Sequence, residues 1–332
     1  MAIPIIVCDD SQMARKHLIR ALPPEWPVDI TQCAHGGEAL DALRLGKNRV
    51  MFLDLTMPVL DGYQTLQAMR DEKLQCAVIV VSGDVQEQAV VRVLQLGALA
   101  FVRKPLEKDE LANLLREHGL LEVRVSAPVQ TVDVGANAIT FRDCFREVCN
   151  VAMGRAAALL AKVMDVFVRL PIPSVNEIEP SELLMALSAS QQDTRVSAVC
   201  QGYIASGIAG EALLLFHDAS VKEIAALMKS QANNEQQELE LFMDISSIII
   251  GACLKGLAEQ IDTPFSQGHP VVLGRHCKVT DIIKVNQARW KKMLSVEICY
   301  TLEKYNVSFD LLLLFTEDSI PRLQNKLAYM ME

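Results

Sequence analysis

Short apolar runs alternate with amphipathic segments along roughly the first third of the chain. The runs are rich in Val, Ile and Leu and are bounded by turn residues, which is typical of strands buried in a parallel sheet. Between them, apolar residues recur at three- and four-residue intervals, which predicts helices. The expected strands are 3–8, 28–33, 50–54, 76–82 and 98–102, and the expected helices are 11–21, 36–45, 62–69, 85–96 and 108–118. These five βα units predict an α/β fold with a five-stranded, doubly wound parallel sheet.

The rest of the chain has a different pattern, in which long helices alternate with pairs of strands. The expected elements are helices 141–164, 180–187, 218–229, 234–261 and 318–330, a short strand 166–170, and two hairpins, 196–205 with 207–216 and 295–302 with 307–315. Residues 123–136 show no strong period and contain Ser, Pro and Gly, which indicates a linker. The sequence therefore predicts one domain over 1–122 and a second over 137–332.

The second domain contains an internal repeat. The sequence Leu-Leu-Leu-Phe at 213–216 recurs 99 positions later at 312–315, and Ser220 recurs as Ser319. Each half has a long helix, then a Pro, a hairpin and a further helix. We expect a pseudo-twofold α/β domain in which the hairpins merge into one antiparallel sheet and the two long helices lie together.

Composition narrows the function classes. The net charge is −9 and aromatic residues make up 5% of the chain, and no basic stripe with interleaved aromatics occurs, so we expect no nucleic-acid partner. The nine cysteines are scattered without a C-x-x-C pair, which speaks against a zinc site or a redox dithiol. No apolar run reaches the about 18 uninterrupted residues of a membrane span. We expect a cytoplasmic protein without membrane insertion.

Polar residues follow four of the predicted strands of the first domain. They are Asp9, Asp10, Asp54, Ser82 and Lys104. Because parallel strands present their carboxyl ends at one edge of the sheet, these side chains are expected to converge there. Three carboxylates at one edge favour Mg²⁺, a lysine holds a phosphoryl oxygen as a point charge, and a Ser hydroxyl holds another.

This set, together with Pro58, Gly62 and Pro105, resembles CheY-like response-regulator receiver domains over residues 1 to about 122. The resemblance implies that Asp54 is phosphorylated by a sensor histidine kinase. It implies that Mg²⁺ is bound by the acidic pair Asp9 and Asp10, mainly Asp10, with Asp54 and the Thr56 carbonyl. It also places Phe101 where the family keeps an aromatic switch, although core packing explains Phe101 equally well.

Asp143, Glu147 and Asn150 are spaced to share one face of the helix expected over 141–164. The pattern D-x3-E-x2-N followed by a Pro resembles the CheC/CheX family of chemotaxis phosphatases, with Pro173 one residue later than is usual there. The resemblance implies that Asn150 orients a hydrolytic water and that Glu147 pairs with a receiver lysine. The second repeat carries Asp244 and Ser247 instead, which predicts a degraded second site.

Together these features predict a two-component, chemotaxis-type phosphoprotein. Its receiver, phosphorylated on Asp54, would regulate a phosphatase domain that hydrolyses the phosphoryl-aspartate of a CheY-like regulator. One alternative is a non-catalytic binding module that docks a chemotaxis or flagellar partner under control of the receiver. Another is that the site clears Asp54 in its own chain or in a dimer mate. The sequence allows a homodimer and leaves the sign of regulation open.

Overall fold

The computed structural model describes residues 2–46, 49–121, 139–178, 195–230, 232–286 and 293–331. The chain divides into two compact units, one of Met1–Glu147 with Met330–Glu332 and the other of Val148–Tyr329. The expected linker 123–136 and the expected helix 180–187 lie outside the described residues. The domain boundaries expected from the sequence therefore stay predictions.

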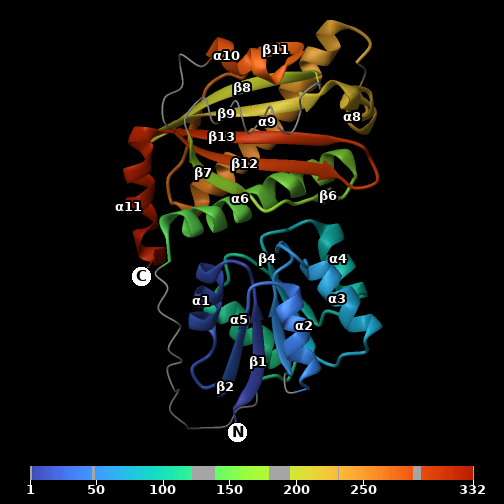
Figure 1. Cartoon of the computed structure of the whole chain (residues 1–332), viewed down its shortest axis with the longest axis vertical. Coiled ribbons are helices and arrows are strands. Elements are labelled where there is room, and N and C mark those ends of the chain that lie inside the picture. The colour runs from blue at the N-terminus through green and yellow to red at the C-terminus, as the bar shows by residue number, and fades with distance from the viewer. Residues whose placement is uncertain are drawn as a thin grey trace. The chain divides into compact units, whose positions relative to one another are not determined.

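The first unit contains a five-stranded parallel sheet in the order β2-β1-β3-β4-β5 (Figure 1). Its strands are β1 (Ile3–Cys8), β2 (Val28–Cys33), β3 (Val50–Leu53), β4 (Ala77–Ser82) and β5 (Ala100–Arg103). Its helices are α1 (Gln12–Ala21), α2 (Gly36–Arg44), α3 (Gly62–Asp71), α4 (Glu87–Gln95) and α5 (Lys108–Glu117). The α/β fold and the parallel sheet expected from the sequence are confirmed for this unit.

The helices of the first unit cover both faces of the sheet. One buried cluster joins the strands to apolar residues of α2, α3 and α4, and a second joins them to α1 and α5. Strand β3 is buried along its whole length because alternate side chains enter the two clusters. This burial explains why its sequence reads as a continuous apolar run.

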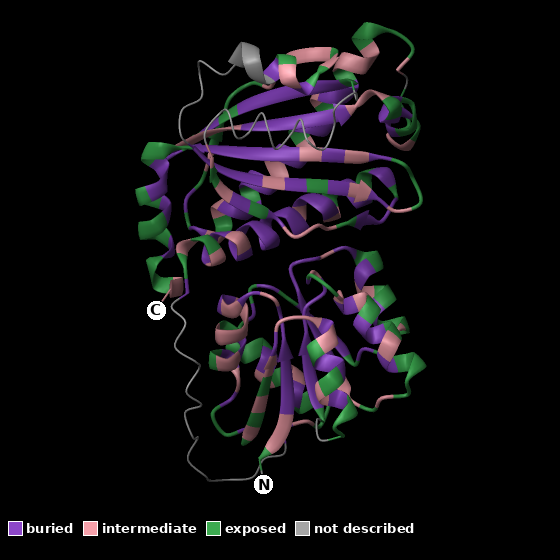
Figure 2. Cartoon of the chain, viewed as in Figure 1, coloured by how far each residue is buried: buried purple, intermediate pink, exposed green. Residues whose placement is uncertain are grey.

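The second unit is built on an antiparallel sheet in the order β10-β8-β9-β13-β12-β6, with β11 also paired to β8 and β7 to β12. The strands are β6 (Val168–Arg169), β7 (Ser174–Ile178), β8 (Arg195–Ala205), β9 (Ile208–His217), β10 (Ser266–Gln267), β11 (Val271–Lys278), β12 (Met293–Leu302) and β13 (Ser308–Thr316). The helices are α6 (Phe141–Met164, which begins in the first unit), η1 (Asp218–Ser220), α8 (Val221–Leu227), α9 (Glu235–Gln260), α10 (Val279–Asn286), η2 (Glu317–Ser319) and α11 (Ile320–Met331). Figure 2 shows β8, β9 and β13 buried over most of their length.

The register of the central strands follows the internal repeat. Strands β9 and β13 are antiparallel, with Leu213 opposite Leu312, Phe216 opposite Phe309 and Gly210 opposite Phe315. In the internal repeat, Phe315 is equivalent to Phe216, and Phe309 is equivalent to Gly210. The pair Phe216–Phe309 on one side of Leu213–Leu312 is therefore equivalent to the pair Phe315–Gly210 on the other side. The two hairpins therefore merge into one sheet about a local pseudo-twofold axis.

The long helices α6 and α9 lie against each other. A side chain at Gly256 of α9 would lie 2.7 Å from the Cα of Ala152 in α6, so the two helix backbones cross closely there. Arg155 and Glu259 form an ion pair beside this crossing. Within the described residues, α9 is long and apolar enough to span a membrane by composition, but 56% of that stretch is buried inside the molecule, as is typical of a core helix.

Four elements of the second unit were not expected from the sequence. These are β7, β10, β11 and α10. Strand β11 has register shifts against β8 between Val272 and Gly274 and between Gly274 and Cys277, which interrupt the period-two pattern that marks a strand. Strand β7 is an edge strand with the partly polar sequence Ser-Val-Asn-Glu-Ile.

Candidate functional site

The candidate site lies at the carboxyl ends of β1, β3, β4 and β5. Cys8 and Leu53, the last residues of β1 and β3, are paired in register, as are Ser82 and Arg103 of β4 and β5. Asp9, Asp54 and Lys104 follow these paired positions directly. The parallel register therefore brings them to the same edge of the sheet.

Asp54 is 2% exposed and is held from two sides. The backbone N–H of Thr56 donates a hydrogen bond of 2.8 Å to Asp54 Oδ2. Lys104 Nζ lies 3.1 Å from Asp54 Oδ1 and forms an ion pair with it. Oδ1 is buried, and its charged partner among the described residues is the Lys104 ammonium group.

Lys104 contacts three carboxylates. Its ammonium group donates hydrogen bonds of 2.7 Å to Asp9 Oδ2 and 2.9 Å to Glu147 Oε1, in addition to the ion pair with Asp54. Glu147 is the last residue of the first unit and lies near the start of α6. Carboxylates therefore outnumber cations around this lysine, and the excess negative charge favours binding of a further cation.

Burial first, and neighbouring carboxylates second, raise the pKa values of the acids. Burial raises the pKa of Asp10 to about 6, and the neighbouring Asp9 adds to the increase. Burial also raises the pKa of Asp9 and of Asp54, with Lys104 opposing the shift in both. For Lys104, burial acts to lower the pKa, but the carboxylates of Asp54, Asp9 and Glu147 outweigh it and raise the pKa well above the ordinary value.

Asp9, Asp10 and Asp54 are close enough to share a metal ion. One carboxylate oxygen from each lies within 4.8 Å of the others. Asp9 is already engaged by Lys104 and by the N–H of Ser11. The all-oxygen donor set fits Mg²⁺ better than a softer metal.

Ser82 and Phe101 frame the site from neighbouring strands. Ser82 is fully buried, and its Oγ accepts a hydrogen bond of 3.1 Å from the N–H of Asp84. Phe101 is partly buried and packs against the apolar cluster under α2 and α3, a position compatible with either core packing or a switch role. Asp84 accepts hydrogen bonds from Gln86 and Tyr63, so its carboxylate is engaged within the loop after β4.

The helix α6 carries the three residues singled out from its sequence. Asp143 forms a reciprocal cap with Thr140, since the Asp143 N–H donates to Thr140 Oγ1 and the Asp143 carboxylate accepts from that hydroxyl. Asp143 therefore secures the helix start. Glu147 and Asn150 follow on the same helix and are 6% and 7% exposed, which is unusual for polar residues on a solvated helix face.

The equivalent residues of the second repeat lie in different surroundings. Asp244 and Ser247 are exposed on α9, and the Ser247 hydroxyl donates a hydrogen bond of 2.8 Å to the carbonyl of Met243. A hydroxyl turned back to its own helix is poorly placed to orient a water molecule. That this copy is a degraded site stays a prediction.

Two arginines near the acids were not singled out from the sequence. Arg15 donates a hydrogen bond to the backbone carbonyl of Asp9, and Arg146 Nη2 lies 3.6 Å from Asp10 Oδ2. Arg15 lies four residues after the cap Ser11, on the first turns of the helix that follows β1. That spacing is the one sequence signal that could have identified it.

Comparison with known proteins assigns a family to the first part of the chain. The family model for the response regulator receiver domain matches residues 5–116. The protein-glutamate methylesterase/protein-glutamine glutaminase of Clostridium acetobutylicum is 32% identical over 115 residues, which cover 34% of this chain and 33% of that protein. The probable C4-dicarboxylate response regulator DctR of Bacillus subtilis is 31% identical over 101 residues, covering 30% and 45%.

Among solved structures, a chain in the CheX–CheY–BeF3–Mg²⁺ complex from Borrelia burgdorferi is 27% identical with a TM-score of 0.33, covering 35% of this chain and 89% of that one. Both curated relatives are matched over less than half of their own length. The matched segment coincides with the parallel sheet and with the strand ends that carry Asp9, Asp54, Ser82 and Lys104. Residues 5–116 of this chain are therefore a response regulator receiver domain.

Proposed function

We propose that Asp54 is the phosphoryl acceptor of a two-component signalling protein and that a sensor histidine kinase is the donor. The support is the position of Asp54, which is buried, has its Oδ1 3.1 Å from Lys104 Nζ, and has a carboxylate oxygen within 4.8 Å of those of Asp9 and Asp10. Asp54 Oδ1 attacks phosphorus, the bond from phosphorus to the donor histidine nitrogen breaks, and that nitrogen takes up a proton. Lys104 and the Ser82 hydroxyl then hold two of the phosphoryl oxygens.

Mg²⁺ is the cofactor that this donor set fits. Asp10 and Asp54 would hold it with the backbone of Thr56, since Asp9 is engaged by Lys104 and Ser11. When bound, the ion supplies positive charge to the transferring phosphoryl group. Burial is the main cause that raises the pKa values of Asp9, Asp10 and Asp54, and the neighbouring carboxylates add to the increase.

For the second part of the chain, the proposal is hydrolysis of phosphoryl-aspartate by the Glu147 face of α6. The observation that carries it is the 2.9 Å hydrogen bond from Lys104 to Glu147. It is the contact that the resemblance to the CheC/CheX phosphatases implies for Glu147. Asn150 lies one helical turn further along α6 and is buried.

The reaction proposed for this face needs a positioned water and no covalent enzyme intermediate. The Asn150 side-chain carbonyl accepts a hydrogen bond from the water, whose oxygen attacks phosphorus in line with the aspartyl oxygen. The bond between phosphorus and that oxygen breaks, the carboxylate is regenerated, and inorganic phosphate leaves as H2PO4−, which carries both hydrogens of the water. Glu147 acts as a positioning residue through the lysine.

The test is the lifetime of the phosphoryl group on Asp54 and on a separate CheY-like regulator. Both are phosphorylated by a histidine kinase, the donor is removed, and phosphate release is followed with the wild-type chain and with Asn150→Ala. If Asn150 orients the water, the variant slows hydrolysis of its target by about 100-fold, the effect of misplacing a reacting group. A longer lifetime on Asp54 alone identifies the chain's own receiver as the target.

The second repeat offers matched controls. Ser247→Ala and Asp244→Asn change the equivalent positions on α9 and are expected to leave both lifetimes unchanged. Equal lifetimes with the wild-type chain and Asn150→Ala contradict the hydrolase proposal. Capture of a chemotaxis or flagellar partner that survives Asn150→Ala, with no hydrolysis by either protein, favours the binding-module alternative.

A further inference from the structure

Each of the three acids at the candidate site has a cationic partner among the described residues. Lys104 Nζ lies 2.7 Å from Asp9 Oδ2 and 3.1 Å from Asp54 Oδ1. Asp10 is paired with Arg146, whose Nη2 lies 3.6 Å from Asp10 Oδ2. Arg146 lies in the first turns of α6, in the part of this helix that belongs to the first unit. A metal ion that binds these acids therefore has to share them with two protein cations.

The two protein cations differ in how easily a metal ion can replace them. The Lys104 side chain is 6% exposed and contacts three carboxylates, so moving it away would leave buried charges unpaired. The Arg146 side chain is 32% exposed, and its guanidinium group is carried by a long, flexible stem. Turning this group into water costs little, because a partly exposed ion pair contributes little free energy. Arg146 is therefore the cation that can be exchanged.

Asp10 is the acid on which the proposed Mg²⁺ site depends most. Asp9 is already engaged by Lys104 and by the N–H of Ser11, so the ion has to rely on Asp10 and Asp54. Two cations held on one carboxylate repel each other, so the binding of one weakens the binding of the other. The guanidinium group and the ion therefore oppose each other at Asp10.

We propose that Arg146 competes with Mg²⁺ for Asp10. This inference rests on the proposed Mg²⁺ site and adds a protein cation that sets its affinity. Because Arg146 directly precedes Glu147, the start of α6 presents a cation to Asp10 and a carboxylate to Lys104. The two neighbours act on the metal in opposite directions, since Arg146 weakens its binding and Glu147 strengthens it by adding negative charge.

The test is a titration of MgCl2 into the full-length chain without a phosphoryl donor, at constant ionic strength so that screening does not change. Isothermal titration calorimetry gives the Kd for Mg²⁺. Arg146→Gln is expected to lower this Kd about fivefold, the upper end for a partly exposed ion pair. Arg146→Lys keeps the charge and is expected to stay closer to the wild type. Glu147→Gln is expected to raise the Kd.

Arg49→Gln is the matched control for the loss of one positive charge. Arg49 is exposed and directly precedes β3, whereas Asp54 follows the other end of this strand, so the Kd should not change. Equal Kd values for the wild type and Arg146→Gln would overturn the competition and leave the Mg²⁺ site standing. A lower Kd in both Arg146→Gln and Glu147→Gln would also overturn it, because the start of α6 would then only cover the acids. If neither the wild type nor any variant binds Mg²⁺ at millimolar concentration, the proposed metal site fails and this inference fails with it.

Discussion

Lys104 Nζ lies 3.1 Å from Asp54 Oδ1, and both side chains are almost completely buried. The same ammonium group contacts Asp9 and Glu147. Removing the cation from such a cluster leaves several buried carboxylates close together, whereas removing one carboxylate relieves their mutual repulsion. The two changes therefore have opposite effects on stability.

We predict that Lys104→Met lowers the free energy of unfolding of the first unit by about 3 kcal/mol, the lower end for breaking a buried ion pair. In the Lys104→Met background, Asp54→Asn is expected to restore part of this loss. Urea denaturation can be followed through Trp26, which is buried against Phe52, in a Trp290→Phe background. A further loss of stability on adding Asp54→Asn would contradict the idea of a carboxylate excess.

We predict that Gly62→Ala impairs phosphorylation of Asp54. A Cβ at Gly62 would lie 2.3 Å from the backbone carbonyl oxygen of Asp54, so the loop that holds Asp54 must move. The expected cost is about 1–3 kcal/mol in stability, as for other overpacked sites, with a lower rate of phosphoryl incorporation from acetyl phosphate. At Gly37 the nearest atoms belong to the ring of His35, 3.1 Å away, and not to the loop that holds Asp54, so Gly37→Ala should leave the rate unchanged.

We predict opposite effects of two glycine substitutions on α9. Gly256→Ala places a Cβ 2.7 Å from the Cα of Ala152 and is expected to destabilise the second unit by about 1–3 kcal/mol. Among the described residues, a Cβ at Gly251 would meet the end of the Gln267 side chain, at 3.8 Å, so Gly251→Ala is expected to stabilise the helix by about 0.5–1 kcal/mol. Thermal unfolding of both variants measures the difference. Equal melting temperatures would contradict the close helix crossing.

We predict that His276 makes the stability of the second unit fall at alkaline pH. Its Nδ1 lies 2.9 Å from Asp218 Oδ2 and its Nε2 lies 3.3 Å from Glu238 Oε2, so the doubly protonated ring satisfies both carboxylates. The hydrogen bond with Asp218 is the main cause that raises the pKa of His276 above 6.5, and Glu238 adds to it. Glu235 and Arg275 lie nearby as an ion pair.

Because the folded state holds this proton more tightly, the His276 contribution is complete below pH 6.5 and is lost as pH rises through the folded pKa. His276→Gln should remove this pH dependence while changing little at alkaline pH. Urea midpoints measured across this range for the wild type and the variant test the prediction. An unchanged pH profile in His276→Gln would assign the effect to another group.

Much of the fold follows from local sequence pattern. The helix expected over 141–164 has the bounds that the structure gives α6, and the strands of the first unit agree within two residues. These elements were predictable because each is long enough, or buried enough, to show an unbroken period. Strand β11 was missed because its bulges near Gly274 shift the side-chain alternation, and β7 because an edge strand needs no apolar run.

The candidate site was also predictable only in part. The positions of Asp9, Asp54, Ser82 and Lys104 were predictable because a parallel sheet places the carboxyl end of each strand at one edge, whichever residues surround it. The sequence pattern also marked Glu147 and Asn150 as sharing a helix face. Only the structure shows the helix cap that Thr140 and Asp143 form, and the hydrogen bond from the Ser247 hydroxyl to its own helix.

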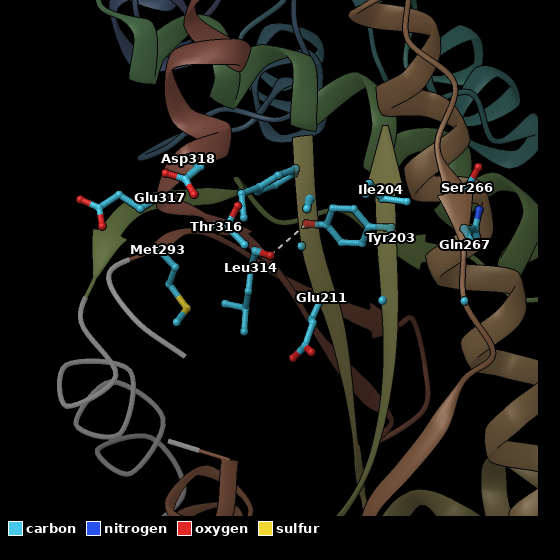
Figure 3. Close-up of a pocket in the computed structure, with 15 residues that line it drawn as sticks. Tyr203, Ile204, Glu211, Ser266, Gln267, Met293, Leu314, Thr316, Glu317 and Asp318 are labelled. Carbon is cyan, nitrogen blue, oxygen red and sulfur yellow. Dashed lines mark hydrogen bonds between the residues drawn. The ribbon is translucent and has the colours of Figure 1, made fainter. Parts of the chain in front are cut away.

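By itself, the sequence determined the five strand ends and the residue types placed there, because strand burial and helix periodicity are local properties of the chain. Only the tertiary structure decided that Lys104 contacts Glu147 as well as Asp9 and Asp54, and that Leu213 meets Leu312 at the centre of the second sheet. It also decided that Gly202, Glu211 and Leu314 lie in one row along a cavity in the second unit (Figure 3). These contacts join residues far apart in the chain, and no local period encodes which distant side chain completes the packing and charge around a buried group.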